Sequence, residues 1–401
     1  MSGPDPTVPT HDLVVVGAGL VGLATAFAYL RRHPGADVVV VEAAPRVGTG
    51  QSGHNSGVLH AGVYYAPGSL KAQLCGRGKA MLEDYAADRG IPIDHCGKVV
   101  VALDEDELDP LAELERRATA NAVPGLTRLD AAGLREVEPA VAGIAALHSP
   151  GTAVIDFGAV CRALAADVTA AGAEVRLATP VVDVVDRGDH VVVATAPGND
   201  DLTARRVVVC AGLQADRLPP STDGTRIVPF RGTWSLLAPA HAQRIRGNVY
   251  PVPDPKHPFL GVHLTPRRGQ VWVGPNAVLA GSRTGNRRGA VDRVDLRDTV
   301  THRGFWRLAA DNVAAGAREL ANDRLRARYA AEVARMLPGV TPDDLLPGPS
   351  GTRAQAVRRD GSLVDDFLLD DDGLVLRVRN APSPAATASL AIGEHLADLL
   401  G

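Results

Sequence analysis

The chain contains 401 residues, of which 46 are acidic and 42 are basic, so its formal net charge is −4. This balance excludes a strongly basic nucleic-acid-binding protein, and the length suggests two or three domains whose core needs no disulfide or metal. The four cysteines lie far apart without a Cys-x-x-Cys pair, so neither a zinc site nor a disulfide framework is indicated, and we expect a cytoplasmic protein.

The N-terminal region contains one stretch that is apolar enough to resemble a membrane span. Residues 1–11 are polar and proline-rich, and we expect a flexible arm there. Residues 13–30 are all uncharged, which reaches the length of a candidate span. The stretch contains Gly17, Gly19 and Gly22 after a β-branched run, so a strand, a turn and a helix explain it better. We expect no transmembrane segment, and no basic amphipathic helix or hydrophobic tail is evident, which favours a soluble protein.

Residues 12–42 follow the order strand, Gly-x-Gly-x-x-Gly turn, helix, strand and acid. Gly17 permits the tight turn, Gly19 lets the backbone approach a pyrophosphate, and Gly22 lets the helix pack closely on the strand. Glu42 would accept hydrogen bonds from ribose hydroxyls, and its charge argues against the 2′-phosphate of NADP. The pattern predicts a dinucleotide-binding domain and leaves FAD and NAD open.

Three later segments favour FAD over NAD. The glycine- and serine-rich stretch 46–57 resembles the second phosphate-binding region of FAD-dependent amine and hydroxy-acid oxidases. The strand 205–212 resembles the one with which these proteins return to the FAD domain, and residues 351–355 and 380–387 before an apolar helix resemble their final FAD-contacting part. Besides the three glycines and Glu42, the predicted FAD contacts are Arg46, Ser52, Gly53, His54, Asn55, Ser56, Val181, Ala211, Gly212, Arg353, Pro384, Ala385, Ala386 and Thr387.

The remaining pattern predicts a second domain that alternates with the first along the chain. We expect helices over residues 70–89, 109–121, 157–171 and 388–400, a strand over 99–103, a hairpin over 181–194, an antiparallel sheet within 227–275 and helices within 287–337. The expected fold is α/β: a discontinuous Rossmann-like FAD-binding domain (12–75, 145–225 and 345–401) with an interwoven α+β substrate domain built on an antiparallel sheet (76–144 and 226–344).

Several longer motifs resemble the L-2-hydroxyglutarate oxidase/dehydrogenase family. They are residues 52–65 with 67–71, 259–266, 274–280, 365–367 and 380–390, and the resemblance runs from about residue 12 to 400. It implies an FAD enzyme that oxidises a small L-2-hydroxy acid, first L-2-hydroxyglutarate to 2-oxoglutarate, by hydride transfer to flavin N5. O₂ or a quinone would be the electron acceptor.

Two segments depart from this family. Residues 233–235 are Thr-Trp-Ser where the family has Glu-Tyr-Tyr, and residues 284–286 are Thr-Gly-Asn where it has Glu-Gly-Tyr after the arginine. Both segments fall in the predicted substrate domain. Oxidation of an amino acid or amine C–N bond therefore stays open as the alternative reaction.

The reaction needs a base for the hydroxyl proton and cations for substrate carboxylates. His54, His60 and His263 are the candidate bases because the histidine pKa lies near working pH, and we favour His263 by its position. The opposing interpretation is a histidine held in a turn or packed at the domain interface, and His54 or His60 could instead hold the flavin. The candidate substrate-binding residues are Tyr65, Lys71, Arg231, His263, Arg283 and Gln355, while Arg353 and Gln355 could equally contact the flavin.

Overall fold

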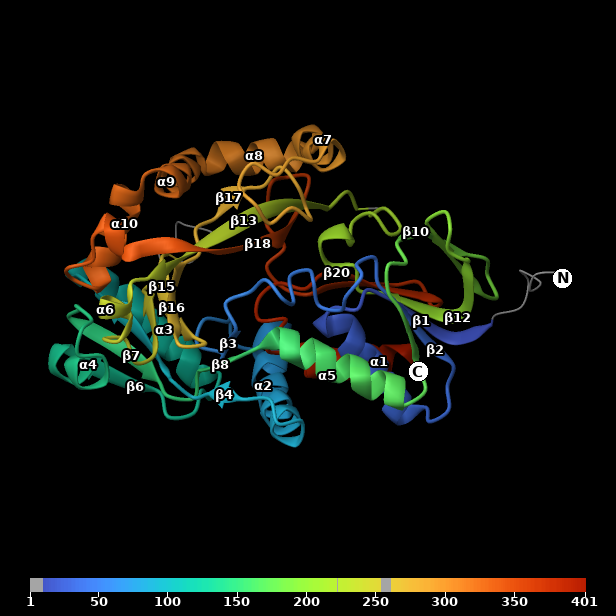
Figure 1. Ribbon diagram of the computed structural model, residues 1–401, viewed down its shortest axis with the longest axis horizontal. Helices are drawn as coiled ribbons and strands as arrows, with labels where there is room; N and C mark the ends of the chain where they lie inside the picture. Colours follow the sequence, from blue (N-terminus) through green and yellow to red (C-terminus); the bar gives the residue numbers. More distant parts are fainter. Residues whose placement is uncertain (1–9, 222, 254–260) are drawn as a thin grey trace.

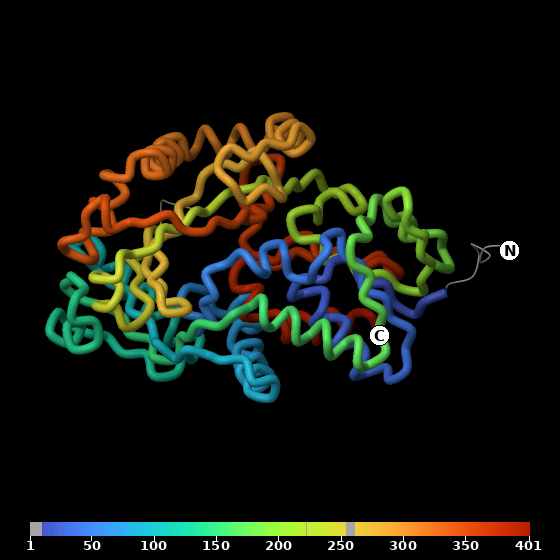
Figure 2. The backbone as a smooth tube through the Cα atoms, viewed as in Figure 1, coloured from blue at the N-terminus to red at the C-terminus, as the bar shows by residue number. Residues whose placement is uncertain are grey.

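The computed structural model describes residues 10–221, 223–253 and 261–401 (Figure 1). Two large sheets lie side by side along the long axis, and a small three-stranded sheet lies near the middle. Figure 2 shows that the N-terminal and C-terminal segments lie together in the half that holds the first sheet. The chain crosses between the halves several times, because each large sheet takes strands from distant parts of the sequence.

The first sheet is built around the predicted dinucleotide unit. β1 (His11–Val16) pairs in parallel with β2 (Val38–Val41) on one side and with β12 (Leu202–Val209) on the other. β2 is buried along its whole length, as expected for a β-branched strand covered on both faces. α1 (Leu20–Arg32) follows β1 and packs against α11 (Ser389–Leu400). The other elements of this half are α5 (Phe157–Ala170), β9 (Glu174–Arg176), β10 (Val181–Asp186), β11 (Val191–Thr195), η2 (Gly212–Gln214), β19 (Leu368–Asp371) and β20 (Val375–Asn380).

The second sheet has nine strands, and nearly all neighbours are antiparallel. Its longest pair joins β13 (Arg226–Leu237) to β18 (Leu345–Val357), and its one parallel pair among the described strands joins β14 (Asn248–Pro251) to β5 (Lys98–Ala102). The remaining strands are β6 (Thr127–Asp130), β7 (Ala145–Ser149), β15 (His263–Arg267), β16 (Gln270–Gly274) and β17 (Val278–Leu279). The helices of this half are η1 (Glu105–Glu107), α3 (Leu108–Ala120), α4 (Ala131–Val137), α6 (Pro239–Ala242), α7 (Arg293–Thr301), α8 (Arg303–Asp311), α9 (Val313–Arg324), α10 (Arg326–Met336) and η3 (Pro342–Asp344).

The small sheet connects the two halves. It contains β3 (Val58–Leu59), β4 (Ile93–Asp94) and β8 (Ala153–Ile155), and α2 (Leu70–Asp88) lies beside it. Because β3 follows directly after the stretch 46–57, this sheet fixes where that stretch ends. The predicted α/β fold with an interwoven antiparallel sheet is confirmed.

The sheets divide the chain somewhat differently from the predicted domain boundaries. Residues 145–149 and 345–357 fall in ranges expected for the FAD-binding domain, yet they pair in the nine-stranded sheet as β7 and β18. A strand's own sequence predicts that it is extended, whereas its partner is set by packing, which explains the shift. Thr10 already extends β1 by bonding to Thr203, so the expected arm is shorter at this end, and residues 1–9 lie outside the described part. The expected strand at Phe259 also lies outside the described residues.

Candidate active site

The glycine turn between β1 and α1 leaves no room for side chains. Gly17 has a φ of +107°, and a Cβ there would lie 2.5 Å from the Cys210 carbonyl oxygen. A Cβ on Gly22 would lie 1.9 Å from the Gly17 carbonyl oxygen. At the start of α1, Gly19 provides no side-chain cap, and the first turn carries no acidic residue. The helix N-terminus therefore offers backbone N–H groups and a positive dipole end to an anion, as a pyrophosphate site requires.

Glu42 follows β2 and borders the glycine turn. Its two carboxylate oxygens accept hydrogen bonds from the backbone N–H groups of Ala18, at 2.8 Å, and Ala44, at 2.9 Å. These bonds fix the carboxylate beside the turn, where the dinucleotide interpretation expects a ribose. Arg46, four residues on, is exposed.

The stretch 48–57 is held in place by its own polar side chains. Ser52 Oγ accepts a hydrogen bond from Leu20 N–H at 3.0 Å, which joins the stretch to the start of α1. The Asn55 amide donates to the carbonyl oxygens of Gln51 and Ser52 and accepts from Gly57 N–H. A Cβ on Gly53 would meet the Gly48 carbonyl at 2.5 Å, so the turn is tight here as well. The Ser56 side chain makes no hydrogen bond within the described residues.

The same stretch touches the second sheet. His54 Nδ1 lies 3.1 Å from the Ser350 carbonyl oxygen on β18, while the ring is exposed. The Arg267 guanidinium on β15 donates to the Asn55 carbonyl oxygen and lies 4.5 Å from the Trp272 ring centre. The stretch thus contacts both large sheets, and His54 forms its contact with the second sheet at an exposed position.

The C-terminal segment before α11 lies next to residues 58–60. Thr387 Oγ accepts a hydrogen bond from His60 N–H at 3.1 Å and is fully buried. Backbone bonds from Ala385 N–H to the Pro382 carbonyl and from Ala388 N–H to the Pro384 carbonyl form the turn that leads into the helix. Like α1, α11 has no side-chain cap and no acidic residue in its first turn. Two helix starts whose own N-cap residues provide no side-chain cap therefore border the predicted FAD segments.

The other predicted FAD contacts are spread around these segments. Gly212 begins η2, and a Cβ there would lie 3.4 Å from Gln51 Oε1, so η2 borders the stretch 48–57. Ala211 is the N-cap residue of η2, and Val181 begins β10 at the edge of the first sheet. Ala386 is half-buried and packs on the core that contains α1 and α11.

A cluster of cationic and aromatic side chains lies beside His60. Lys98 begins β5 and is 2% exposed, and its Nζ lies 4.9 Å from the Tyr64 ring centre and 4.2 Å from that of Tyr250. The Tyr250 ring stacks on His263 with centres 4.0 Å apart. Within the described residues Lys98 Nζ makes neither an ion pair nor a hydrogen bond. Among the described residues, its ammonium contacts the faces of these two aromatic rings, which favour a cation.

Arg353 completes this cluster from β18. The described residues give its guanidinium no ion pair or side-chain hydrogen bond either. After burial, which is the main cause, the charge of Arg353 also lowers the His263 pKa, so the guanidinium and the imidazole interact electrostatically. Two cations that form no ion pair within the described residues therefore lie around one histidine, and the Glu319 carboxylate acts on Arg353 only through its charge. Such an arrangement is costly unless an anion completes it.

Burial dominates the pKa values of this cluster. It lowers the pKa of Lys98 to about 7, near the point where ammonium and amine are equally populated. Burial, followed by the charges of Arg353 and Lys98, lowers the His263 pKa to about 3, against an opposing hydrogen bond with Gly261. Burial and then the Lys98 and His263 charges lower the His60 pKa well below its usual value. Both histidines are therefore neutral at physiological pH.

The hydrogen bonds of the two histidines differ. His263 Nδ1 lies 2.9 Å from the Gly261 carbonyl oxygen, and since a carbonyl only accepts, we assign the proton to Nδ1. His263 Nε2 is then a free acceptor, fixed in direction by the stacking on Tyr250. His60 Nδ1 and the Tyr64 hydroxyl are buried without a hydrogen-bond partner in the described structure. Such unpaired polar atoms fit a site that receives a ligand, and His60 lies next to Thr387 of the predicted FAD-contacting segment.

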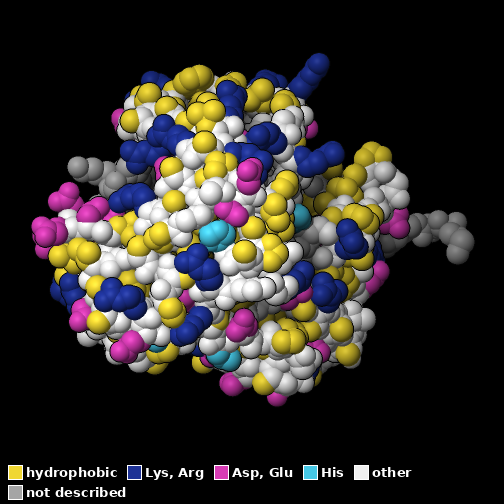
Figure 3. Space-filling model, turned by 60° about the vertical axis from the view of Figure 1, so that its left-hand side comes forward, with side chains coloured by type: hydrophobic (Ala, Val, Ile, Leu, Met, Phe, Trp, Pro, Cys, Tyr) yellow, Lys and Arg dark blue, Asp and Glu magenta, His cyan; other side chains and the backbone are white. Residues whose placement is uncertain are grey.

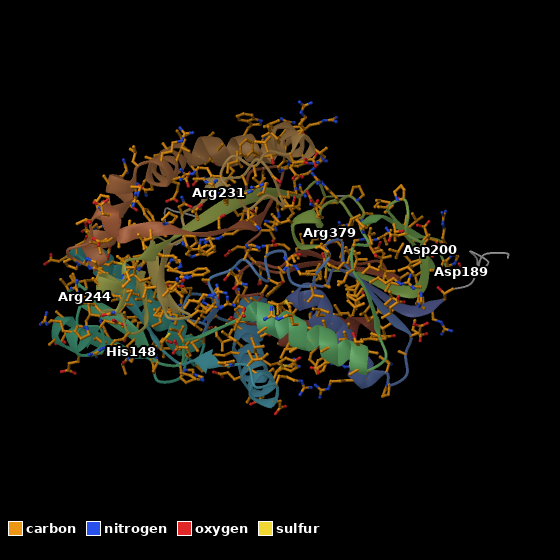
Figure 4. All side chains as sticks on the ribbon, viewed as in Figure 1. His148, Asp189, Asp200, Arg231, Arg244 and Arg379 are labelled. Atoms are coloured by element: carbon orange, nitrogen blue, oxygen red, sulfur yellow. The ribbon has the colours of Figure 1, made fainter. Side chains whose placement is uncertain are left out.

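Three predicted substrate residues are engaged elsewhere. Arg231 on β13 pairs with Asp323 of α9 at 2.9 Å, between the strand layer and the helices above it (Figure 4). Arg283 is completely buried and bonds both oxygens of Asp216, with Asp295 at 3.8 Å. Lys71 Nζ binds Asp365 at 2.9 Å. These ion pairs give each cation a structural partner within the protein, so we do not include them in the proposed substrate site.

Tyr65 lies in the cluster with Tyr64 and Tyr250. Gln355 lies on β18, two residues after Arg353. Burial raises the Tyr65 pKa well above its usual value, and Cys75 and the neighbouring tyrosines raise it further, whereas a hydrogen bond with Ser383 lowers it. Gln355 pairs along β18 with Val228. The sequence analysis missed Lys98, Tyr64 and Tyr250. The only available signal was a lysine at the start of a buried β-branched strand, which usually indicates a solvated strand end.

The comparisons with known proteins identify the class. The family model DAO, described as FAD dependent oxidoreductase, matches residues 12–399. The protein is thus an FAD-dependent oxidoreductase. Three features of the described structure fit that cofactor: the glycine turn between β1 and α1, the N-termini of α1 and α11, and the His60 nitrogen without a hydrogen-bond partner.

Similar proteins narrow the family. The chain is 41% identical to the mitochondrial L-2-hydroxyglutarate dehydrogenase of Nematostella vectensis over 97% of its length and 90% of that protein. It is 40% identical to the mitochondrial L-2-hydroxyglutarate dehydrogenase of Homo sapiens over 97% of its length and 88% of that protein. The chain therefore belongs to the L-2-hydroxyglutarate dehydrogenase family within the FAD-dependent oxidoreductases, as the sequence motifs predicted.

Solved structures support the fold. The L-alpha-glycerophosphate oxidase from Mycoplasma pneumoniae with FAD bound has a TM-score of 0.79 at 22% identity, covering 98% of this chain and 95% of that one. Glycine oxidase from Bacillus cereus has a TM-score of 0.70 at 17% identity, covering 98% and 95%. Among the described helices, none is long and apolar enough to cross a membrane.

Proposed function

We propose that the protein oxidises L-2-hydroxyglutarate to 2-oxoglutarate. The observation that carries this proposal is a pair of cations, Lys98 and Arg353, that form no ion pair within the described residues. Their strands, β5 and β18, lie on opposite sides of β15, which carries the neutral His263. A 2-hydroxy dicarboxylate has two carboxylates for the two cations and one hydroxyl for the base. The names of the relatives point to the same substrate.

The binding step uses the two cations differently. Arg353 presents a planar guanidinium that can hold one carboxylate with two parallel hydrogen bonds. Lys98 acts as a point charge held by the faces of Tyr64 and Tyr250, and an anion would shift it fully to the ammonium form. Because both groups are buried among aromatic rings, each ion pair forms in an environment with little competing water.

The proton of the substrate hydroxyl passes to His263 Nε2. The Gly261 carbonyl holds the opposite ring nitrogen in its protonated form, so Nε2 is the acceptor, and Tyr250 fixes the plane of the ring. Burial is the main cause that lowers the His263 pKa, and the charges of Arg353 and Lys98 lower it further. Two bound carboxylates would offset those two charges and so raise the His263 pKa in part. His60 is the second candidate, because its buried Nδ1 has no partner in the described structure.

The FAD cofactor supplies the acceptor for the hydride that leaves the α-carbon. The glycine turn, Glu42 and the N-terminus of α1 would hold its dinucleotide part, and residues 382–388 with the N-terminus of α11 would border the ring. We propose O₂ or a quinone as the final acceptor and the cytoplasm as the location. All four cysteines are free, which a reducing compartment permits.

The second candidate function is oxidation of an amino acid or amine C–N bond. Asn286, one of the departures from the family pattern, binds the backbone and hydroxyl of Thr352 directly before Arg353. Asn286 thus lies next to Arg353, which we propose binds a substrate carboxylate. A change at this position can therefore alter which substrate group is accepted near Arg353. The cationic Lys98 argues against a positively charged amine.

Anaerobic reduction of the bound flavin tests the proposal. L-2-hydroxyglutarate should bleach the flavin absorbance and release 2-oxoglutarate, whereas D-2-hydroxyglutarate, L-glutamate and glycine should not. Bleaching by an amino acid alone would replace the proposal with the second candidate. Peroxide release in air, compared with reduction of a soluble quinone analogue, separates the two acceptors.

A further inference from the structure

The two segments that depart from the family pattern meet at one strand. Residues 233–235 lie on β13, where they pair with residues 347–350 of β18 across a register shift. Residues 284–286 lie in the loop between β17 and α7, and Asn286 of this loop bonds the next part of β18. Both departures therefore contact β18 just before Arg353, the residue that we propose binds a substrate carboxylate.

The outer edge of β18 needs partners for its backbone groups. Among the described strands, β13 is the one that pairs with β18, so the opposite edge of β18 has no neighbouring strand. Thr352 on this edge is 3% exposed, and a buried N–H without a partner is costly. Two side chains provide the missing contacts, His54 and Asn286.

The two side chains bind neighbouring positions of this edge. His54 Nδ1 lies 3.1 Å from the Ser350 carbonyl oxygen. Asn286 Oδ1 accepts hydrogen bonds from the Thr352 N–H at 3.0 Å and from the Thr352 hydroxyl at 3.1 Å. The Ser350 hydroxyl also donates to the Asn286 carbonyl oxygen. Asn286 thus takes the place of an adjacent strand along this part of β18.

The loop that carries Asn286 is itself anchored. Ser282 Oγ accepts a hydrogen bond from the Gly285 N–H at 3.0 Å, and the Asp295 carboxylate accepts one from the Arg283 N–H at 2.7 Å. The loop leads into α7 and so into the layer of helices that forms the upper lobe in Figure 3. It therefore ties the edge of β18 to that layer.

The bonds of Thr352 decide where Arg353 lies. Arg353 is the next residue of the strand, and its other backbone neighbour across the sheet is Phe230. A guanidinium binds a carboxylate through two parallel hydrogen bonds only when the two planes match. A displacement of about 1 Å can cost about a hundredfold in rate. The contacts that fix β18 at Thr352 therefore act on the substrate through Arg353.

We propose that Asn286 is a positioning residue for Arg353, because its clamp on the edge of β18 sets where the guanidinium meets the substrate carboxylate. This inference rests on the proposed function, which takes Arg353 as a carboxylate ligand. Both bonds from Thr352 use the amide oxygen of Asn286 as their acceptor. The tyrosine of the family pattern carries no acceptor at this reach, so the clamp is a feature of this chain.

The substitution Asn286→Ala in the FAD-loaded protein tests the clamp and its effect together. Hydrogen–deuterium exchange of peptides from β18 should become faster, since the Thr352 N–H loses its acceptor. The KM for L-2-hydroxyglutarate should rise about tenfold, while kcat changes less than about threefold. Asn286→Asp keeps an acceptor oxygen at the same position and should restore both readouts in large part. If Asn286→Ala does not fold, Thr352→Val removes one of the two bonds and should cause the same changes to a smaller degree.

A double variant separates positioning from a general structural role. If Asn286 acts through Arg353, Asn286→Ala should have no further effect on kcat/KM once Arg353→Met has removed the guanidinium. The matched control is Asn322→Ala, at an asparagine that is 5% exposed and bonds Glu332 at 2.9 Å, away from β18. This control should leave both the exchange of β18 and the KM unchanged.

The outcomes distinguish this inference from the proposed function. Unchanged exchange of β18 in Asn286→Ala, or losses that add up in the double variant, would overturn the positioning role. So would a KM that rises in Arg353→Met but not in Asn286→Ala, and the proposed function would then still stand. A normal KM in Arg353→Met would refute the carboxylate role of Arg353 in the proposed function, and the positioning role with it.

Discussion

Lys98 Nζ lies 4.2 Å from the centre of the Tyr250 ring, and the other neighbour of that ring is His263, with ring centres 4.0 Å apart. One aromatic side chain thus separates a buried cation from the proposed base. The strands that carry these three residues are β5, β14 and β15, which are adjacent in the second sheet. Because they are adjacent there, a change at Lys98 should affect both substrate binding and the titration of the histidine.

We expect Lys98→Met to reduce kcat/KM for L-2-hydroxyglutarate by roughly a hundredfold, since a buried charge-assisted contact with a carboxylate is lost. The flavin content should stay normal, because Lys98 lies outside the glycine turn between β1 and α1 that we expect to bind FAD. Steady-state kinetics and the flavin absorbance measure both effects. Lys79→Met, on the partly exposed side of α2 where Lys79 pairs with Glu83, is the control and should keep full activity. Full activity of Lys98→Met would remove Lys98 from the substrate site.

The same substitution should stabilise the protein in a pH-dependent manner. The Lys98 pKa is about 7 in the folded protein against about 10.4 in the unfolded chain, so folding must desolvate an ammonium at low pH. Between these two values the unfolded chain binds more protons, and the free energy of unfolding of the unmodified protein rises with pH. Lys98→Met should therefore be more stable by a few kcal/mol below pH 7, with the gain fading toward pH 10. Urea unfolding at pH 6 and pH 9 measures it, and an equal gain at both values would contradict the buried ammonium.

Arg353→Met should raise the KM for L-2-hydroxyglutarate, and Arg353→Lys should restore binding only in part because lysine lacks the two-pronged geometry. If each cation holds one carboxylate, the monocarboxylate L-lactate should respond strongly to only one of the substitutions Arg353→Met and Lys98→Met. Comparison of kcat/KM for both substrates in both variants checks this. Arg244→Met, at an exposed arginine near α6, serves as the control. Equal losses on L-lactate in both variants would show that the pairing of cations and carboxylates is wrong.

Arg283→Met should destabilise the protein without a specific effect on catalysis. The substitution leaves Asp216 buried without its guanidinium partner, which typically costs about 3–5 kcal/mol, whereas Asp295 keeps its ion pair with Arg217. Chemical unfolding should show this loss, while the KM of the remaining folded enzyme stays near normal. A large rise in KM with unchanged stability would instead place Arg283 in the substrate site.

Gly22→Ala should prevent FAD binding, because its Cβ would meet the Gly17 carbonyl oxygen at 1.9 Å and push the turn apart. Gly50→Ala is a matched control in the same region, since a Cβ there meets no atom within 4 Å. Protein-bound flavin measured after purification distinguishes the two. Normal flavin content in Gly22→Ala would show that the turn does not need its close contact.

The sequence predicted the cofactor half better than the substrate half. The glycine spacing and Glu42 located the dinucleotide turn, and the helix 70–89 and the hairpin 181–194 were found close to their observed bounds. The sequence did not show which arginines are available to bind the substrate. Arg231 and Arg283 occur in motifs as suggestive as that of Arg353, yet their carboxylate partners lie 92 and 67 residues away in the chain. The sequence also did not indicate which face of the helices within residues 287–337 meets the core, because that face is set by contacts with the rest of the fold.

The sequence by itself determined the β1–turn–α1–β2 unit and the acid that follows it, because these features depend on spacing within about thirty residues, where chain geometry fixes distance. Only the tertiary structure decided that Lys98 and Arg353 form no ion pair with a carboxylate of the described residues and that Lys98 lies against Tyr64 and Tyr250. Burial and ion pairing arise from contacts between distant strands. A charged side chain can bind a ligand only if these contacts have not already paired it with an opposite charge of the protein.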